Sequence, residues 1–259
     1  MRWTPPSTLR EKLKRAVFSP RQELKRIVAR ELRRGEPELR LLPHLVDPGR
    51  ASVDVGANRG VWTHQLATLC PRVYAYEPNP KMFAILDAAR PANAVTRNIA
   101  LSDRPGVGGL KVPRSARGYS NQHASLETNW AAAVDFGVVE VATARLDDLD
   151  LEPVGFIKID VEGHEHAVVA GAAGLIARDQ PTLLIELEER HSEQSIEASI
   201  AAVEALGYDA FVFKDGALRP IAAFDPEADH RVAVETPSYI FNFIFKIFNF
   251  IFKPRAPGT

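Results

Sequence analysis

The stretch Ser52-Val-Asp-Val-Gly-Ala-Asn-Arg-Gly60 holds the features that decide the fold of this chain. A short β-branched run ends in a turn that contains Gly56 and Gly60, and an amphipathic helical pattern begins directly after it. Strand, glycine turn and helix in this order open nucleotide-binding α/β units. The stretch therefore predicts a strand over 51–55 and a helix over 59–69.

The turn is not the dinucleotide pattern G-x-G-x-x-G, and a carboxylate, Asp54, comes two residues before its first glycine. A phosphate group would be repelled there, whereas a ligand with an ammonium group and a sulfonium would be attracted. S-adenosylmethionine is such a ligand. Glu77 follows about 20 residues after the turn, at the spacing from which a carboxylate accepts both hydroxyls of a ribose. We therefore expect a nucleoside site that includes Asp54, Gly56, Asn58, Gly60 and Glu77.

Length and composition are those of a globular enzyme-sized chain. The 259 residues are enough for one large α/β domain with a substantial core, and the net charge of −1 says little about partners. The single cysteine, Cys70, excludes an internal disulfide and fits a reducing compartment. The basic N-terminus lacks the continuous apolar segment of a secretory signal, so the expected location is the cytoplasm.

Strand-like and helical patterns alternate after residue 50. The predicted strands are 51–55, 72–77, 94–100, 154–159 and 181–187, and the predicted helices are 59–69, 79–90, 164–178 and 192–206. Apolar strands that alternate with helices indicate a parallel, doubly wound sheet that is buried on both faces. Residues 101–150 interrupt the alternation with several glycines and a β-like run over 137–144. They predict an inserted hairpin with a mobile loop, 113–136, beside the ligand cleft.

The N-terminal segment is strongly basic. Residues 1–34 carry 11 Lys or Arg against 3 Asp or Glu, a net charge of +8. Residues 7–34 predict two short basic helices divided at Ser19-Pro20. We divide the chain into a basic helical arm, 1–49, and a catalytic domain, 50–259. The favoured interpretation of the arm is a helical cap with solvated charges. A surface for an anionic lipid head group or a nucleic acid is the alternative.

The C-terminal region contains a tandem repeat, Ile-Phe-Asn-Phe-Ile-Phe-Lys, at 240–246 and identically at 247–253. Seven is odd, so one continuous strand would place the phenylalanines of the two copies on opposite faces. One interpretation is a duplicated final strand, with one copy in the sheet and one left over. A helix with a heptad period is the other. The sequence does not decide between them, or between the copies.

A third acidic position follows the strand 154–159. Asp160 ends an otherwise apolar run, and Glu162, His164, Glu165 and His166 crowd the start of the next helix. Ligands of open α/β sheets sit at the carboxyl ends of strands, so Asp160 is the first candidate for a catalytic carboxylate. His164 is the second candidate, and His123 in the inserted loop is the third. Asp160 and Glu186 could together bind a divalent cation, but no dense ligand cluster supports a metal, and we expect none.

These motifs resemble those of the FkbM family of S-adenosylmethionine-dependent O-methyltransferases, over about residues 50–253. The matching stretches are 54–60, 76–80, 98–103, 124–126, 145–149, 157–163 and the final Asn-Phe-Ile-Phe strand. The resemblance implies a Rossmann-like, seven-stranded methyltransferase sheet with an antiparallel last strand. It adds Asn98, at the start of the third stretch, to the expected cofactor-binding residues.

The resemblance further implies methylation of a hydroxyl on a sugar, glycolipid or polyketide-type product, by in-line transfer from S-adenosylmethionine. An alcohol needs a positioned base, which contributes on the order of 10²–10⁴ in rate. We expect no nucleic-acid partner, and peripheral membrane contact through the basic arm is an open alternative. Methylation of a nitrogen or a carboxylate, or a non-catalytic nucleotide-binding or membrane-docking role, are the rival functions.

Overall fold

The computed structural model describes residues 3–9, 11, 17–115, 118–121, 124–127, 135–189, 192, 194–231 and 247–256. Its helices and strands are, in chain order, α2 (Pro20–Arg34), η1 (Pro37–Arg40), α3 (Leu42–Leu45), β1 (Ala51–Val55), α4 (Val61–Leu66), β2 (Val73–Tyr76), α5 (Pro80–Ala89), β3 (Ala94–Arg97), β4 (Ala100–Leu101), β5 (Gly106–Ser115), β6 (Gly118–Tyr119), β7 (Phe136–Ala144), η2 (Leu146–Asp148), β8 (Val154–Ile159), α6 (Glu165–Ala170), α7 (Ala173–Asp179), β9 (Thr182–Glu186), α8 (Ile196–Glu204), β10 (Tyr208–Lys214), β11 (Ala217–Pro220), η4 (Ile221–Ala223), η5 (Pro226–His230) and β12 (Asn249–Pro254). The first of the two predicted arm helices lies largely outside these residues.

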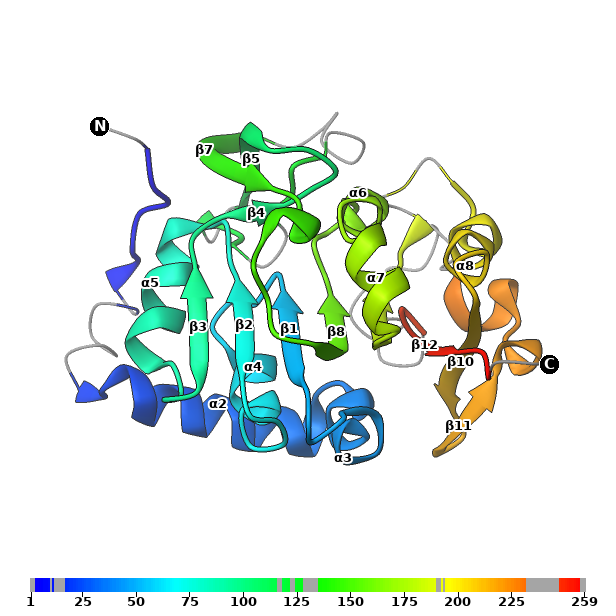
Figure 1. Cartoon of the computed structure of the whole chain (residues 1–259). Helices are drawn as coiled ribbons and strands as arrows, with labels where there is room; N and C mark the ends of the chain where they lie inside the picture. The colour runs from blue at the N-terminus through cyan, green and yellow to red at the C-terminus, as the bar shows by residue number, and fades with distance from the viewer. Residues whose placement is uncertain are drawn as a thin grey trace.

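The main sheet has the strand order β11-β10-β12-β9-β8-β1-β2-β3 (Figure 1). Neighbours from β9 to β3 run parallel, and β12 runs antiparallel to both β9 and β10. The predicted doubly wound, seven-stranded sheet with an antiparallel last strand is confirmed. The short strand β11 pairs with β10 and adds an eighth strand at the edge. The strand order switches between β1 and β8, where such sheets bind their ligands.

Alternating side chains give the sheet two buried faces. Val53 and Ile157 pack in the cluster that also contains Val168 of α6 and Ile176 of α7. Phe156, one residue away on β8, packs instead with Trp62 and Leu66 of α4. Burial on both sides explains why these strands are nearly continuous apolar runs. The polar residues that alternate with them, Asp54 and Lys158, therefore point toward the α4 side and are buried there.

Two predicted elements are divided in the structure. The helix expected over 164–178 is α6 and α7, broken at Gly171, where a Cβ would lie 2.0 Å from the carbonyl oxygen of Ser102. The strand expected over 94–100 is divided into β3 and β4. Asn98 lies between them, and its side-chain amide donates to the backbone carbonyls of Glu77 and Pro78, which follow β2. Other boundaries differ by a few residues. The helix predicted from 192 begins at Ile196, because the Ser195 side chain caps it.

The insertion 101–150 forms the predicted hairpin. Strands β5 and β7 pair antiparallel from Gly106↔Thr143 to Pro113↔Phe136, with β4 beside β7. Figure 1 shows this small sheet above the tips of β1, β2 and β8. A further segment, 124–127, is attached to it by the bridge between Lys111 and Ser125. The mobility expected for the loop 113–136, which lies partly outside the described residues, stays a prediction.

Helix α2 packs on the domain as the favoured interpretation of the arm expects. A capping box at Ser19 starts the helix, and Leu24 and Val28 are buried in a cluster with Ala89 of α5. The basic side chains of α2 lie on its other faces, and no described helix is long and apolar enough to cross a membrane.

The second repeat copy supplies β12, so a heptad helix is the wrong interpretation for that copy. Phe250 and Phe252 enter one core cluster and Ile251 the other. The first copy, 240–246, lies outside the described residues. The two ends of the segment 232–246 meet, because Ile247 N–H donates to the Asp229 carbonyl at 2.7 Å and His230 Nδ1–H donates to the Ile247 carbonyl at 2.8 Å.

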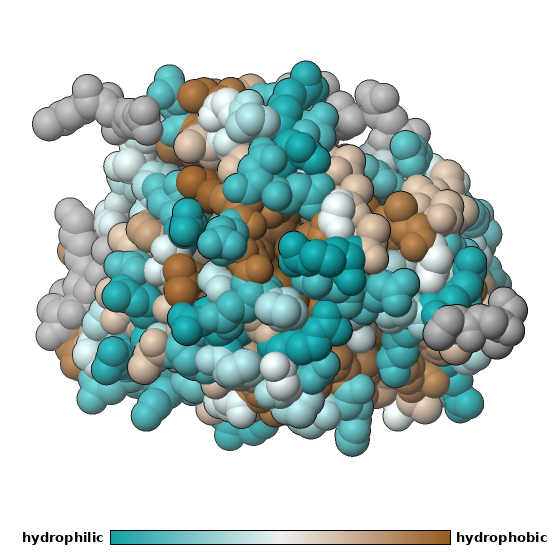
Figure 2. All heavy atoms as spheres, in the orientation of Figure 1, coloured by the Kyte–Doolittle hydropathy of each residue, from teal (hydrophilic) through white to brown (hydrophobic). Residues whose placement is uncertain are grey.

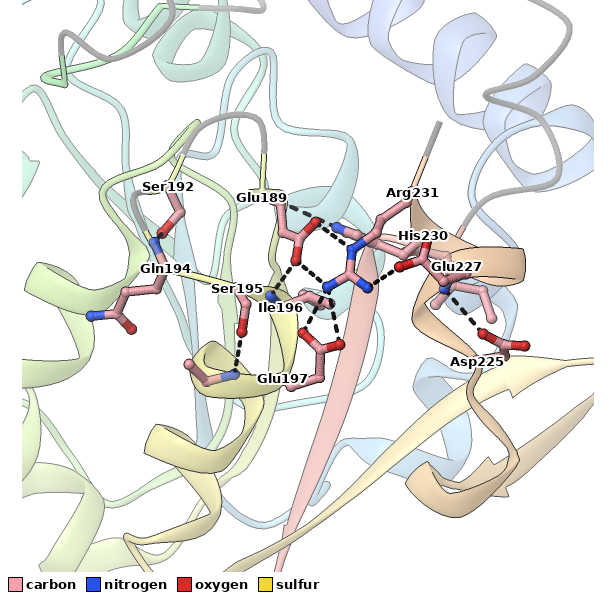
Figure 3. Close-up of polar contacts among 12 residues, drawn as sticks. Glu189, Ser192, Gln194, Ser195, Ile196, Glu197, Asp225, Glu227, His230 and Arg231 are labelled. Atoms are coloured by element: carbon pink, nitrogen blue, oxygen red, sulfur yellow. Dashed lines mark hydrogen bonds and ion pairs between the residues drawn. The ribbon is translucent and has the colours of Figure 1, made fainter. Parts of the chain in front are cut away.

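Arg231 holds the first of these ends in place. Its guanidinium contacts the carboxylates of Glu189, Glu197 and Glu227 at 2.7, 2.9 and 2.5 Å (Figure 3). We call Arg231 and these three residues the C-terminal clasp.

Candidate functional site

The glycine turn after β1 brings the backbone against the end of β8. Gly56 has φ +76°, and a Cβ on it would lie 1.8 Å from the carbonyl oxygen of Asp160. Gly60 has φ +90° and would press a Cβ against Leu86 at 2.7 Å. Asn58 also adopts a left-handed conformation, φ 51°. The turn thus requires glycine at 56 and 60 for conformation and for close approach.

Glu77 ties this turn to the end of β2. One carboxylate oxygen accepts the Asn58 N–H at 2.7 Å and the other accepts the Asn79 N–H at 2.7 Å. The side chain is 6% exposed, and burial raises its pKa to about 7 against the lowering effect of those amides. Each oxygen keeps a lone pair for a ribose hydroxyl. Asn98 donates to the Glu77 and Pro78 carbonyls at 2.8 and 2.9 Å and so holds this loop.

Asp54 lies beneath the turn. It is fully buried, and its Oδ2 accepts the Thr63 hydroxyl at 2.5 Å, which fixes the start of α4. Its Oδ1 has no hydrogen-bond partner among the described residues, and burial raises its pKa. Asp54, Gly60 and Asn98 do not line the cavities described below. Their direct contact with a cofactor stays a prediction, and their observed contacts shape the turn.

A first cavity, of about 60 Å³, opens between the strand tips and the β5–β7 hairpin. Figure 2 shows apolar side chains gathered in this part of the surface, bordered by hydrophilic ones. It is lined by Val55, Gly56, Asn58, Tyr76, Glu77, Pro78, Ile99, Ala100, Leu101, Leu110, Asn121, Ala124, Leu126, Asp160, Val161, Glu162 and His164. Tyr76 is 1% exposed, and its buried hydroxyl has no partner among the described residues. The cavity therefore combines apolar walls with an unused polar group and the Glu77 carboxylate.

A second cavity, of about 360 Å³, lies on the other side of the glycine turn. Its lining comprises Ile27, Arg30, Glu31, Glu36, Leu39, Gly56, Ala57, Asn58, Arg59, Val61, Trp62, Lys158, Asp160, Glu162 and Glu186. Gly56, Asn58, Asp160 and Glu162 line both cavities, so they mark the junction between the two.

Asp160 is paired with a buried lysine at this junction. Lys158, 2% exposed, donates its Nζ to Asp160 Oδ2 at 2.7 Å and lies 5.8 Å from the centroid of the Trp62 ring. Burial alone would lower the pKa of Lys158, but the carboxylates of Asp160 and Asp54 outweigh it and raise that pKa. Lys158 is therefore a fixed positive charge directly beside the Asp160 carboxylate.

His164 lies in a chain of polar contacts on the wall of the first cavity. Its Nδ1 is 2.6 Å from Glu127 Oε1, and its Nε2 is 2.9 Å from the Ser102 hydroxyl. Ser125 anchors this arrangement, since its hydroxyl accepts the Glu127 N–H and donates to the Glu162 carbonyl. A histidine oriented by a carboxylate is a typical general base. His166 instead contacts Ser199 of α8 at 3.0 Å, and His123 lies outside the described residues.

Further carboxylates surround the junction. Burial, followed by the nearby Asp160 charge, raises the pKa of Glu186 well above its usual value. Glu165 accepts the N–H groups of Val161 and Gly163, and burial raises its pKa to about 7. Among the residues with described positions, no group of three or more His, Cys, Asp or Glu is arranged to hold a metal ion.

Four contributors to the site were not singled out from the sequence: Tyr76, Ser102, Glu127 and Lys158. Lys158 was detectable, because residues two apart in a strand share a face, which places it beside Asp160. Ser102 and Glu127 depend on the packing of the insertion, for which no local pattern exists.

Comparison with solved structures found distant likenesses. The FkbM methyltransferase of Methylobacillus flagellatus KT is 16% identical with a TM-score of 0.48, over 79% of this chain and 44% of that chain. This chain thus spans less than half the length of that protein. A TehB-like SAM-dependent methyltransferase from Corynebacterium glutamicum is 12% identical with a TM-score of 0.46, over 90% and 95% of the two chains. An rRNA methylase from Streptococcus thermophilus is 14% identical with a TM-score of 0.42, over 86% and 98%.

Comparison with curated proteins found no match. The FkbM methyltransferase domain, in contrast, matches residues 54–212, which is more than half of the sequence and runs from the glycine turn to β10. The chain belongs to the FkbM methyltransferase family.

Proposed function

We propose that this protein is an S-adenosylmethionine-dependent O-methyltransferase that acts on a hydroxyl of a sugar, glycolipid or polyketide-type product. The observation that carries the proposal is the position of Asp160, a carboxylate at the junction between the first cavity, which Glu77 lines, and the larger second cavity. The acceptor class follows from the family resemblance.

The residues of the first cavity fit the adenosyl part of this cofactor. A side chain at Gly56 would collide with the Asp160 carbonyl, so the turn packs directly on the end of β8 and its backbone lines the cavity. The Tyr76 hydroxyl is buried without a partner, and Glu77 has acceptor capacity for ribose hydroxyls. When bound, S-adenosylmethionine would supply a sulfonium methyl group, which an acceptor oxygen can take while the neutral thioether leaves.

Asp160 is the proposed base. Its Oδ2 is held by Lys158 at 2.7 Å, which fixes the position of the carboxylate. The hydroxyl proton of an acceptor seated at the junction would pass to the Asp160 carboxylate, which lines both cavities. His164 is the second candidate, and in that case the acceptor would take the place of the Ser102 hydroxyl at Nε2.

Transfer of a labelled methyl group to a panel of deoxysugars, glycolipids and polyketides would test the proposal, with Asp160→Asn and His164→Gln measured beside the wild type. We expect Asp160→Asn to lower turnover far more than cofactor affinity. Wild-type turnover in that variant would make Asp160 structural and His164 the leading base. Calorimetry that showed tight NAD binding and none of S-adenosylmethionine would overturn the cofactor assignment, and transfer to an amine or a carboxylate instead would overturn the acceptor class.

Peripheral membrane contact through the basic arm and a cytoplasmic location are parts of the same proposal. Cosedimentation with anionic vesicles, and its loss after reversal of the exposed Arg33 and Arg34 charges, would test the first of these.

A further inference from the structure

The second cavity is built from two parts of the chain that are far apart in sequence. One wall is the glycine turn with β8, and the opposite wall is the arm, through Ile27 and Arg30 of α2 and through Glu36. The arm lies outside the stretch 54–212 that the family domain covers.

The two cavities adjoin each other at the glycine turn and the end of β8. Gly56, Asn58, Asp160 and Glu162 line both, so a ligand whose nucleoside occupies the first cavity would extend past the turn into the second. The remainder of S-adenosylmethionine beyond its ribose is an amino acid with an α-ammonium and an α-carboxylate. A site for that end must present both a negative and a positive partner.

The second cavity presents both charges. Its cations include Lys158 and Arg59, and the Nε–H of Arg59 is buried without an acceptor among the described residues, as expected next to an anionic group of a ligand. Two of its carboxylates, Asp160 and Glu162, lie at the junction. Glu31, Glu36 and Glu186 line the second cavity and not the first, and Glu31 is already paired with Arg30 at 2.6 Å.

The local structure directs Glu36 into the cavity. Helix α2 ends at Gly35, where a Cβ would lie 2.8 Å from the Glu31 carbonyl oxygen, and Glu36 is the next residue, directly before η1. Asn249 of β12 donates to Glu36 Oε2 at 3.3 Å from the opposite side. The carboxylate is thus positioned by the first and the last described elements of the chain.

We propose that Glu36 binds the α-ammonium group of the cofactor, so that the N-terminal arm completes the amino-acid end of its site. This inference rests on the proposed function, because it takes S-adenosylmethionine as the ligand. Arg59 is the cationic counterpart for the α-carboxylate. Recognition of the amino-acid end is then a property of the arm and the turn together, whereas the nucleoside is recognised by Glu77 and the first cavity.

Two ligands distinguish recognition of the amino-acid end from recognition of the nucleoside. S-adenosylhomocysteine carries the amino acid, whereas 5′-methylthioadenosine has the same nucleoside and thioether without it. Calorimetric titration of the full chain should show that Glu36→Gln weakens S-adenosylhomocysteine by about tenfold or more, the usual loss for a charge-assisted hydrogen bond. Affinity for 5′-methylthioadenosine should stay within about twofold, which also shows in the same sample that the variant is folded.

Three further variants serve as controls. Glu77→Gln should weaken both ligands, and Glu23→Gln, at a half-buried α2 residue outside this cavity, should weaken neither. Equal loss of both ligands in Glu36→Gln, or no loss of either, would overturn the inference. Selective loss in Glu186→Gln and not in Glu36→Gln would also overturn it. A wild type that binds neither ligand would overturn the proposed function itself.

Discussion

Two clusters in this protein each hold one cation among several carboxylates, and they differ in their exposure to water. Lys158 is 2% exposed and lies between Asp160 and Asp54 beneath the cavities. Arg231 of the C-terminal clasp has a side chain 31% exposed and contacts three carboxylates at the surface. Charges in water interact weakly, and buried charges interact strongly and are costly when left unpaired. The first cluster is therefore the sensitive one, although the second has more ion pairs.

The largest expected effect is that of Lys158→Met. The substitution leaves the buried Asp54 carboxylate and the partly exposed Asp160 carboxylate without their cation. Removal of one partner of a buried pair usually costs about 3–5 kcal/mol, and the partial exposure of Asp160 places the expected loss at the lower end. We expect the free energy of unfolding in urea to fall by that amount.

The control is the same substitution at Lys25, an exposed residue of α2, which should leave stability nearly unchanged. The double variant Lys158→Met with Asp160→Asn should recover part of the loss, because it removes one of the uncompensated charges. If the double variant is as unstable as Lys158→Met alone, Lys158 acts by packing on Trp62 and not by its charge.

The second effect concerns pH and the nucleoside site. Burial raises the pKa of Glu77 to about 7, and its carboxylate form accepts the ribose hydroxyls in the proposed site. The bound state favours the ionised form, so affinity should rise with pH up to about 7 and then level off. Below that pH the expected change is up to about tenfold per pH unit.

The ligand for this measurement is 5′-methylthioadenosine, which lacks the amino-acid charges. Calorimetry between pH 5.5 and 8.5 should show the rise in the wild type and a flat, weaker profile in Glu77→Gln. A wild-type profile that is flat across pH 7 would mean that Glu77 does not ionise on binding.

The features of this protein that could be predicted from sequence are those that depend on residues close together in the chain. The order of strands and helices, the glycine turn and Glu77 follow from local spacing, and the sheet confirms them. The break at Gly171 arises from contact with Ser102, some 70 residues away, so no helical period could indicate it. Glu127 meets His164 only because the insertion folds over the strand tips.

The repeat shows a different limit. Its two copies are identical, so their own residues could not indicate which one becomes β12. Only their surroundings differ, and the contacts of Ile247 with Asp229 and His230 belong to the second copy.

A smaller effect is expected in the C-terminal clasp. Arg231→Met removes the cation that Glu189, Glu197 and Glu227 share, and the like charges then repel one another. Because water and salt screen these groups, the melting temperature should fall less than in Lys158→Met, and added salt should reduce the difference from wild type. Thermal melting at low and high ionic strength measures this. Arg255→Met, which removes the surface pair with Asp209, is the matched control. A loss as large as that of Lys158→Met, unaffected by salt, would contradict the comparison.

The smallest effect is expected from deletion of one heptapeptide. Removal of 240–246 and removal of 247–253 give the same polypeptide, so a single variant tests both. The remaining copy can form the single strand between β9 and β10. The connection that follows Arg231 shortens from residues 232–246 to residues 232–239. Its two ends are hydrogen-bonded to each other, so eight residues are enough to join them, and a shorter loop costs slightly less entropy to close.

We therefore expect the deletion variant to keep its melting temperature within about 2 °C, which corresponds to about 1 kcal/mol or less for a chain of this size. It should also bind 5′-methylthioadenosine like the wild type. Aggregation should decrease, because an apolar, β-prone segment with a single charge is no longer present in duplicate. Light scattering on heating, together with the titration, measures both expectations. A clearly lower melting temperature with loss of ligand binding would mean that the first copy is also built into the fold, and that the sheet edge at β12 depends on both.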